Sequence, residues 1–461
     1  MNQGDEKDEA PARSRTPHSK EFLEYISSGW AKRPDPSTKT DHVASFAKQR
    51  REKVAVKFSG KVVVIESGAP KTRSNDTEYR YRPHSAFAHL TGWGSRTVPD
   101  SVLVIDAREK QKDILFLRPT AGKDSDEFFA NSAIGEFWVG ARPTLQEVSK
   151  LLEIETRDLK ELEDYLADVD SINLEDEALA EFVSELRLVK DSYEIEQMRL
   201  AVAASVKGFE DIVKVLPSAI GKPRGERVIE TAFFARARQE GNDLGYDTIA
   251  AAGKNACVLH WISNDGEVRP NDLVLVDAGV EVDSLYTADI TRTLPVSGKF
   301  TEAQKEIYLA VLEAADAAFA VAKPGVKFRE VHQAAMKVIA QKSADWGILP
   351  VSAEESLEEE KQFHRRWMVH GTSHHLGLDV HDCAQARKEM YLDAELEEGM
   401  VFTIEPGLYF HADDLLAPEH FRGIGVRIED DVLVTKDGVE NLSAKLPRTP
   451  EEVEKWMASL S

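Results

Sequence analysis

The sequence predicts a two-domain α+β protein, and three observations support this prediction. The chain has 461 residues, its helical and strand-like segments do not alternate strictly, and several apolar strand-like runs end on a carboxylate. A length of this size exceeds what one hydrophobic core usually supports, so we expect two domains. Helices and strands that do not form repeated strand–helix–strand units favour an α+β fold over a doubly wound parallel sheet.

The composition indicates a globular protein and disfavours two classes of partner. Apolar residues make up 42% of the chain and charged residues 30%, and 81 carboxylates against 58 Lys and Arg give a net charge of −23. This charge repels polyanions, so we expect neither nucleic acid nor an anionic membrane as a partner. Two cysteines cannot build a disulfide framework, and no apolar run has the length of a membrane span or of a signal peptide. We therefore expect a cytoplasmic protein.

The first part of the chain predicts a tail followed by a mixed α/β domain. Residues 1–40 are rich in charge, Pro and Ser, and we expect them to be flexible. Residues 41–188 are predicted to form the N-terminal domain. Apolar runs at 61–68, 100–107 and 113–119 are typical of buried strands, and residues 143–188 have the apolar spacing of helices.

Residues 189–461 are predicted to form the second domain. A helix is expected over 189–216, where Asp191 or Ser192 would cap it and Glu194 and Glu196 suit the first turn. Further elements are predicted as helices at 225–240 and 302–322 and as strands at 272–282, 399–407 and 425–435.

The strands of the second domain deliver carboxylates where a core would be expected. "LVLVDAG" ends on Asp277 and "VFTIEPG" on Glu405, while "GVRIEDD" places Arg427 and Glu429 on one face because side chains alternate in a strand. Asp289 follows Asp277 by twelve residues. One buried carboxylate is usually part of a salt bridge, but several in one domain indicate a shared cation.

Histidines add a second signal in "VHGTSHHLGLDVHD", which holds His370, His374, His375 and His381, four of the 13 in the chain. No Glu follows His370, so the zinc-protease pattern H-E-x-x-H is absent. A set of two Asp, two Glu and at least one His, without a thiolate, suits Mn, Co or Zn, and four carboxylates neutralise two divalent ions. Two ions about 3.5–4 Å apart share and activate a water. The residues thus predict a dinuclear metallohydrolase.

The same segments resemble a known family. "VDAGVEVDSLYTADITRTLPVSGKFT", "VHGTSHHLGLDVHD", "FTIEPGLYF" and "FRGIGVRIEDDVLVT" are similar, in this order, to motifs of the pita-bread metallopeptidases, family M24. Within that family they most resemble aminopeptidase P. The resemblance covers roughly residues 185–461 and extends more weakly to "YRPHSAFAHLTGW" in the first domain. It implies a pita-bread (creatinase/aminopeptidase) catalytic domain preceded by an aminopeptidase P-type N-terminal domain.

The resemblance also assigns roles to individual residues. It implies two divalent metal ions, Mn²⁺ first and Co or Zn as alternatives, with Asp289 and Glu429 bridging them. The Asp277–Asp289 spacing is one residue longer than in the family, which predicts a bulge at "EVDSL" and makes Asp283 a rival ligand. The implied metal ligands are Asp277, Asp289, His374, Glu405 and Glu429; the implied catalytic and substrate-contacting residues are Glu405, His260, His370 and His381; Tyr246 and Arg427 are implied to support the ligands.

The implied activity is that of a metallo-aminopeptidase. The resemblance implies hydrolysis of the Xaa-Pro bond at peptide N-termini by a metal-bridged hydroxide, with Glu405 transferring its proton, in a homo-oligomer that is a dimer or tetramer. One alternative is prolidase, which has the same catalytic fold and takes Xaa-Pro dipeptides. A second alternative, from another class, is a catalytically inactive pita-bread module that binds other proteins.

Overall fold

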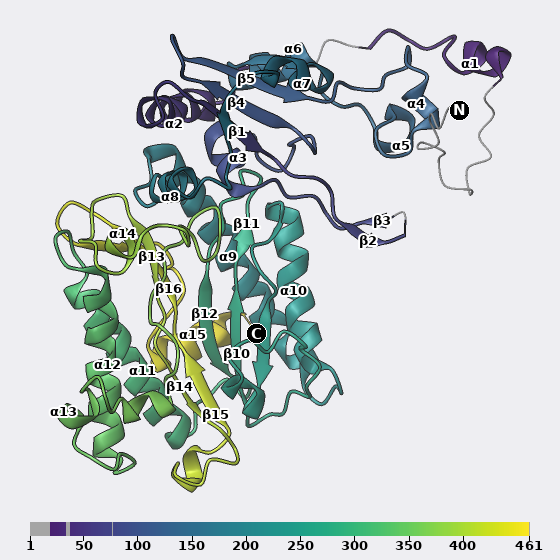
Figure 1. Ribbon diagram of the computed structural model, residues 1–461. Helices are drawn as coiled ribbons and strands as arrows, with labels where there is room; N and C mark the ends of the chain where they lie inside the picture. Colours follow the sequence, from purple (N-terminus) through teal and green to yellow (C-terminus); the bar gives the residue numbers. More distant parts are fainter. Residues whose placement is uncertain (1–18, 34–36, 76, 461) are drawn as a thin grey trace, which may run out of the picture. The chain divides into compact units, whose positions relative to one another are not determined.

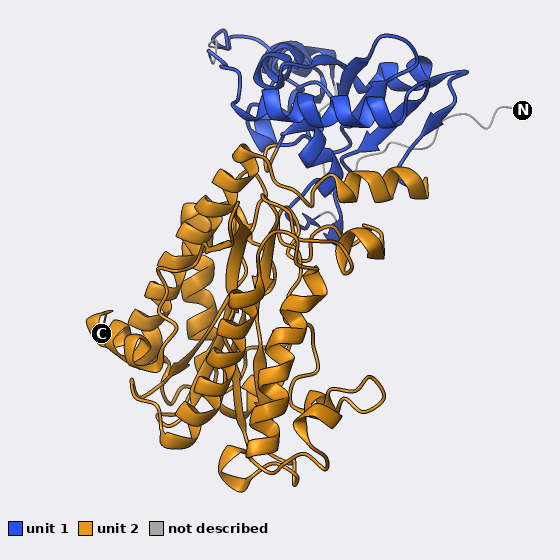
Figure 2. Cartoon of the chain, turned by 90° about the vertical axis from the view of Figure 1, so that its left-hand side faces the viewer, with its two compact units in different colours: residues 1–93, 97–174 blue, residues 94–96, 175–461 orange. Residues whose placement is uncertain are grey.

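The computed structural model describes residues 19–33, 37–75 and 77–460. The chain forms two compact units (Figure 2): the first runs through Trp93 and resumes over 97–174, and the second comprises 94–96 and 175–461. Within the predicted flexible tail, residues 1–18 and 34–36 lie outside the described residues, and Lys20–Ile26 forms helix α1. Helix α8 (Glu177–Glu185), which the sequence analysis assigned to the first domain, lies in the second unit. The domain boundary at residue 188 stays a prediction.

A mixed five-stranded sheet organises the first unit (Figure 1). Its order is β6-β5-β4-β1-β7, with β1, β4 and β5 antiparallel and the two outer strands parallel to their neighbours. The strands are β1 (Val62–Glu66), β4 (Val102–Asp106), β5 (Lys112–Leu117), β6 (Glu155–Asp158) and β7 (Ser171–Ile172), and the accompanying elements are α2 (Val43–Lys57), β2 (Thr72–Ser74), β3 (Thr77–Glu78), α3 (Ser85–Thr91), α4 (Glu127–Ala130), α5 (Glu136–Val139), α6 (Leu145–Leu152) and α7 (Leu162–Leu166).

The three strands predicted for this unit are confirmed, and the physical reason is burial on both faces. Val62, Val104 and Phe116 belong to a core cluster on one face, while Val63 and its neighbours on the other face are also buried. The helical segments predicted over 143–188 are present as α6, α7 and α8, but β6 and β7, which were not predicted, lie between them. Both are short and partly exposed, so they lack the apolar pattern that marks a strand.

The second unit contains the longest helices. Asp191 caps α9 (Ser192–Ala219) in a capping box with Glu194, which confirms the predicted cap. The helix at 225–240 is α10 (Gly225–Glu240), and α11 (Glu302–Val321) agrees with the third prediction. Helix α12 (Phe328–Asp345) was not predicted, although its buried positions recur with helical spacing. The remaining helices are α13 (Ala353–Ser356), α14 (Lys388–Tyr391) and α15 (Pro450–Leu460).

Small antiparallel sheets lie between these helices (Figure 1). Helices α9 and α10 contact the strands from one side, and α11 contacts other strands from the opposite side. The α+β class is confirmed. The strands pair as β12-β10-β9, β13-β16-β17, β14-β15 and β11-β8, with bounds β8 (Asp243–Leu244), β9 (Ile249–Ala252), β10 (Leu273–Ala278), β11 (Val280–Glu281), β12 (Ile290–Pro295), β13 (Val401–Ile404), β14 (Gly407–Phe410), β15 (Ile424–Arg427), β16 (Asp430–Val434) and β17 (Val439–Asn441).

The segment between Asp277 and Asp289, where a bulge was predicted, contains a turn. The Val282 N–H donates to the Tyr286 carbonyl at 2.9 Å, and Leu285 takes a left-handed conformation with φ of 73°. The Asp283 carbonyl accepts the Ser95 N–H at 2.8 Å, and its side chain accepts the Ser95 hydroxyl. Asp283 is therefore directed toward the 94–96 segment of the same unit. In the part of the chain that the structure describes, no helix is long and apolar enough to cross a membrane.

Candidate active site

A cavity of about 640 Å³ in the second unit is lined by all of the implied metal ligands, substrate-contacting residues and supporting residues. The implied ligands and the implied substrate-contacting residues line the same space, although they come from segments far apart in the chain. Asp283, the rival ligand, does not line it. The candidate residues in the cavity wall are Tyr246, His260, Asp277, Asp289, His370, His374, His381, Glu405, Arg427 and Glu429.

Antiparallel strands bring the four carboxylates together. Asp277 lies near the end of β10, and Asp289 directly precedes β12, its antiparallel partner. Glu405 follows β13, and Glu429 lies in the short link between β15 and β16, where its N–H donates to the Thr291 carbonyl of β12. The carboxylates thus lie at the ends of strands and not within an apolar core.

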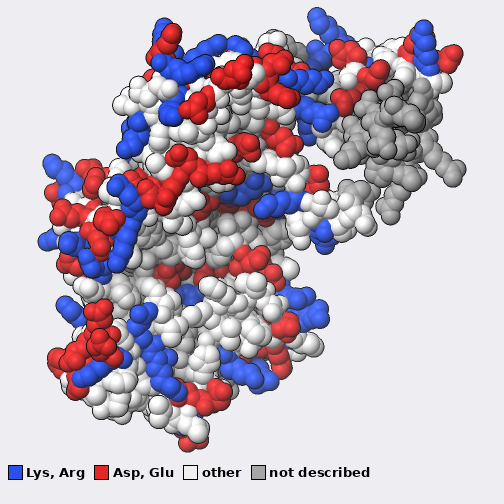
Figure 3. Space-filling model, viewed as in Figure 1, with Lys and Arg blue, Asp and Glu red and all other residues white. Residues whose placement is uncertain are grey.

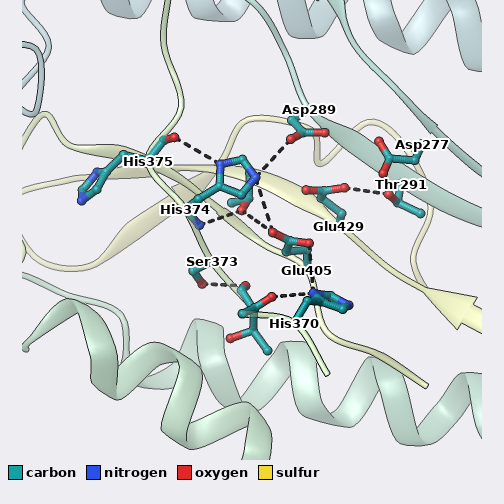
Figure 4. Close-up of polar contacts among 12 residues, drawn as sticks. Asp277, Asp289, Thr291, His370, Ser373, His374, His375, Glu405 and Glu429 are labelled. Carbon is teal, nitrogen blue, oxygen red and sulfur yellow. Dashed lines mark hydrogen bonds and ion pairs between the residues drawn. The ribbon is translucent and has the colours of Figure 1, made fainter. Parts of the chain in front are cut away.

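His374 lies among these carboxylates (Figure 4). Its Nε2 is 3.2 Å from Asp289 Oδ2 and 3.4 Å from Glu405 Oε1. Its Nδ1 donates to the His375 carbonyl at 3.1 Å, an arrangement that leaves Nε2 to face the carboxylates. Ligand atoms of Asp289, His374 and Glu429 all lie within 4.8 Å of one another, close enough to share one ion.

The site carries more negative charge than its own cations balance. Burial raises the pKa of Glu405 to about 7 and, together with the neighbouring carboxylates, raises the pKa values of Asp289 and Glu429. Burial lowers the pKa of His374, but the Asp289 and Glu405 carboxylates outweigh this and raise it to about 9. Arg427 is the one arginine among the described residues that line the cavity, and no lysine lines it. Such a set fits divalent cations, which would compensate the buried carboxylates.

Hydroxyl and guanidinium groups hold the carboxylates from behind. The Tyr246 hydroxyl lies 2.7 Å from Asp277 Oδ1 and 2.5 Å from Asp289 Oδ1, and burial raises its pKa, so it remains a donor. Arg427 donates to Asp277 Oδ2 at 2.5 Å. Thr291 donates its hydroxyl to Glu429 Oε2 at 2.6 Å. These contacts fix the directions in which the Asp277, Asp289 and Glu429 carboxylates point.

The four histidines of the 369–382 segment have different surroundings. The ring of His381 meets the ring of His374 edge-on, with centroids 4.4 Å apart. His370 is bonded at both nitrogens: Nδ1 donates to the Gly371 carbonyl and Nε2 accepts the Tyr409 hydroxyl at 2.8 Å. Burial and the Arg427 charge lower the pKa of His370 to about 3. His375 stacks on Phe328 and points away from the carboxylates (Figure 4).

Besides Thr291, three residues next to the site were not predicted from the sequence. Tyr409 links His370 to Arg427, whose Nη1 donates to the same hydroxyl at 3.0 Å. Tyr409 could have been predicted, because Glu405, Gly407 and Tyr409 are two residues apart, and side chains two apart in an extended chain lie on the same face. Asp431 accepts the Asp289 N–H at 3.2 Å. Tyr391 lines the cavity and accepts the His375 N–H at 3.0 Å, and no sequence pattern indicated it.

Two family descriptions match the chain. Metallopeptidase family M24 matches residues 196–436, and the N-terminal domain of aminopeptidase P matches residues 47–174. The chain belongs to metallopeptidase family M24. Within this family the resemblance to aminopeptidase P is confirmed, and so are the pita-bread fold and the class of metal-dependent aminopeptidase.

Individual relatives extend over nearly the whole chain. Xaa-Pro aminopeptidase 1 of Streptomyces coelicolor is 47% identical over 463 residues, covering 96% of this chain and 93% of its own. Xaa-Pro aminopeptidase of Escherichia coli is 33% identical, covering 90% and 97%. Among solved structures, aminopeptidase P from E. coli with the inhibitor Pro-Leu superposes with a TM-score of 0.79 at 30% identity, covering 92% of this chain and 99% of that chain. Zinc-substituted E. coli aminopeptidase P in complex with product gives the same TM-score.

Proposed function

We propose that the protein removes the N-terminal residue from peptides that have proline in the second position. The observation that carries this proposal is the cluster of four carboxylates and His374 in one cavity, in a chain whose relatives at 47% and 33% identity are named Xaa-Pro aminopeptidases. Prolidase is not favoured, because those relatives match over nearly their whole length. An inactive binding module is not favoured either, because all five implied ligands are present and face the same space.

The proposed cofactor is a pair of divalent metal ions, with Mn²⁺ as the native metal. Asp277, Asp289, His374, Glu405 and Glu429 would hold them, and the dominance of oxygen ligands supports Mn²⁺ over softer metals. When bound, the ions would polarise the scissile carbonyl and activate a water for attack.

Glu405 is the proposed proton carrier. Its Oε2 lies 3.6 Å from His370 Nδ1, at the wall of the cavity. A carboxylate held beside the reacting atoms accepts and returns a proton during a hydrolysis. Glu405 would accept the proton released by the attacking water and pass it to the leaving proline nitrogen.

His381 is the proposed donor to the developing oxyanion. Both ring nitrogens of His370 are engaged within the protein, so His370 has no free N–H to offer without breaking one of these bonds. His381 lines the same cavity, and within the described part of the chain its ring has no such pair of bonds. We assign donation to His381 and the shaping of the cavity wall to His370 with Tyr409.

Selectivity for proline follows from the shape of the substrate. The bond before proline has no N–H, so a site for it gains nothing from an acceptor aimed at that position. Apolar side chains are suited to the pyrrolidine ring instead. We propose that this surface comes from the apolar residues in the cavity wall, Ile249, Leu259, Ile262 and Val380.

A cleavage panel tests the function. The protein, loaded with Mn²⁺, is given a Xaa-Pro-Xaa tripeptide, the Xaa-Pro dipeptide and a Xaa-Ala-Xaa tripeptide. Release of the first residue from the proline tripeptide alone, or much faster than from the others, is expected. Turnover of the dipeptide without the tripeptide would identify a prolidase, and no turnover with no bound metal would identify a binding module.

We also propose a homo-oligomer, a dimer or tetramer, in the cytoplasm. The exposed apolar side chains of Phe137 and Trp138 on the first unit, 58% and 56% accessible, support association. Two buried free cysteines, Cys257 and Cys383, fit a reducing compartment. Light scattering coupled to size-exclusion chromatography measures the oligomeric state, and a monomer at micromolar concentration would contradict it.

A further inference from the structure

A fully buried carboxylate outside the cavity gathers four hydrogen-bond donors. Glu226 lies in the first turn of α10 and has no exposed surface. Its Oε1 accepts the Ala252 N–H at 2.7 Å and the Asn255 amide at 2.9 Å. Its Oε2 accepts the Trp261 indole N–H at 2.8 Å and the Gly266 N–H at 2.6 Å. Glu226 does not line the cavity of the candidate active site.

All four donors belong to the segment 252–266, which carries His260. Two precede His260, one is its direct neighbour and one follows it. Between residues 258 and 263 the backbone makes two local bonds, Val258 N–H to Asn255 and Ile262 N–H to His260, and the Ser263 carbonyl accepts the Arg227 side chain at 3.3 Å. No strand in the described part of the chain pairs with this stretch. The cavity wall takes Leu259, His260 and Ile262 from this stretch. Hydrogen bonds to Glu226 therefore hold the chain both before and after His260.

The Glu226 carboxylate is stabilised by hydrogen-bond donors and not by a neighbouring cation. No Lys or Arg in the described part of the chain forms an ion pair with it. A buried carboxylate without a cation is retained only when several N–H groups point at it. A glutamine would present an NH₂ group to two of these four donors, and each bond lost that way leaves a buried donor unpaired.

The backbone at Gly266 approaches the Glu226 carboxylate closely. A Cβ at this position would lie 2.7 Å from both carboxylate oxygens of Glu226. The close approach of the backbone to the carboxylate thus requires glycine, and the Glu226 backbone N–H in turn donates to the Gly266 carbonyl at 3.2 Å.

We propose that Glu226 is a positioning residue that sets the location of His260 at the substrate through the Trp261 indole. This inference rests on the proposed role of His260 as a substrate contact. Glu226 touches neither the cavity nor the carboxylate cluster, so its effect on the reaction passes through the 252–266 segment.

The test compares E226Q and W261F with E194Q in the full chain. Glu194 is a matched control, because it also lies in the first turn of a helix, is 2% exposed and accepts a hydroxyl bond from Tyr286. Hydrogen exchange of peptides covering 252–266 is measured by mass spectrometry. We expect faster exchange in E226Q and W261F and unchanged exchange in E194Q. W261F removes a single donor, so it serves if E226Q does not fold.

Kinetics supply the second arm. We expect E226Q to lower kcat/KM for a Xaa-Pro-Xaa peptide roughly 10- to 100-fold, the scale of a misplaced contact group, with metal content unchanged. The E226Q/H260A double variant should be no slower than H260A. Losses that multiply in the double variant, or H260A at the wild-type rate, would overturn the inference.

The hydrogen-exchange measurement does not depend on enzymatic activity. If the wild-type protein cleaves no Xaa-Pro peptide, the proposed function fails. Faster exchange in E226Q would still support the anchoring of the segment. Unchanged exchange over 252–266 in E226Q would overturn it, whatever the kinetics show.

Discussion

Two neighbouring histidines, His374 and His375, have opposite surroundings because of local backbone geometry. His375 pairs with Phe402 of β13 in an isolated antiparallel bridge, so the backbone here is extended. Successive side chains of an extended chain point to opposite faces. His374 therefore reaches the carboxylates, and His375 packs against Phe328 in the interior. A pair of adjacent histidines cannot both join one metal site in this conformation.

This geometry predicts different results from two histidine substitutions. H374A should lose both bound metal and activity, because it removes an imidazole from the ligand set. H381A should keep its metal and lose kcat by about 10²- to 10³-fold, the usual effect of one oxyanion donor. Bound metal is measured by mass spectrometry after gel filtration, and kcat is measured on the same preparation. A metal-free H381A protein would contradict the assignment, and H420N, at an exposed position, is the control.

His332 on α12 predicts a dependence of stability on pH. Its Nδ1 accepts the Thr372 N–H at 3.3 Å, and burial, with nearby Arg365, lowers its pKa from 6.5 to about 4. Between these values the unfolded chain binds a proton that the folded chain excludes. The contribution of His332 is therefore full above pH 6.5 and is lost as pH falls toward 4.

The measurement is the urea midpoint at several pH values between 7.5 and 4.5. H332N should show a shallower loss than the wild-type protein, because asparagine offers an acceptor but takes up no proton. H420N should follow the wild-type curve. Parallel curves for H332N and the wild-type protein would show that this ring does not contribute to the acid sensitivity.

At the scale of elements, the β10–β12 pair determines the distance between Asp277 and Asp289. Gly279 follows β10 directly, and a Cβ there would collide with the Ala288 carbonyl just before Asp289. The two strands approach this closely only because the residue is glycine.

G279A should therefore separate the strands and weaken metal binding. Overpacking of this kind costs about 1–3 kcal/mol of stability, and the added methyl also approaches the Tyr246 ring. Metal titration by calorimetry and a urea melt measure both effects. The control is G438A, where an added Cβ has no neighbour within 4 Å. Wild-type metal affinity in G279A would show that the spacing has another origin.

The sequence predicted best those elements whose burial is uniform or whose ends carry clear signals. Asp277 follows four consecutive apolar residues in β10, Glu405 follows the fully buried strand β13, and α9 begins at a capping box. The strand β6 was missed because its four residues, Glu155–Asp158, are largely polar and exposed at an edge. Its place depends on pairing with β5, which local pattern does not encode.

For the candidate site too, local sequence pattern indicated some residues and not others. Asp277 and Glu405 stand out because a charge at the end of an apolar run is costly. Glu226 does not stand out, because a Glu in the first turn of a helix is ordinary and its four partners are 26 to 40 residues away. The metal ligands themselves came from the family resemblance, and their roles stay predictions.

For the whole molecule, the charge of −23 predicts a salt effect on catalysis. Figure 3 shows acidic and basic side chains interspersed on the face in view. We attribute the attraction of cationic peptides to the net charge. The kcat/KM for a peptide with an added Arg should fall as ionic strength rises from about 0.01 to about 0.15 M, where the screening length shrinks from about 30 to about 8 Å. A peptide with Glu at the same place should show the reverse, and identical salt slopes would contradict the prediction.

The short 94–96 segment affects how the two units can be exchanged between relatives. The chain passes between the units three times, after Trp93, after Arg96 and after Leu174. A chimera that imports residues 1–174 as one piece therefore has one covalent junction, after Leu174, and also brings in the 94–96 segment of the second unit. This segment must place a glycine where Gly94 passes the Asp283 carbonyl, because a Cβ would collide with it. Residues 94–96 and the 282–286 turn are thus expected to function only as a matched pair.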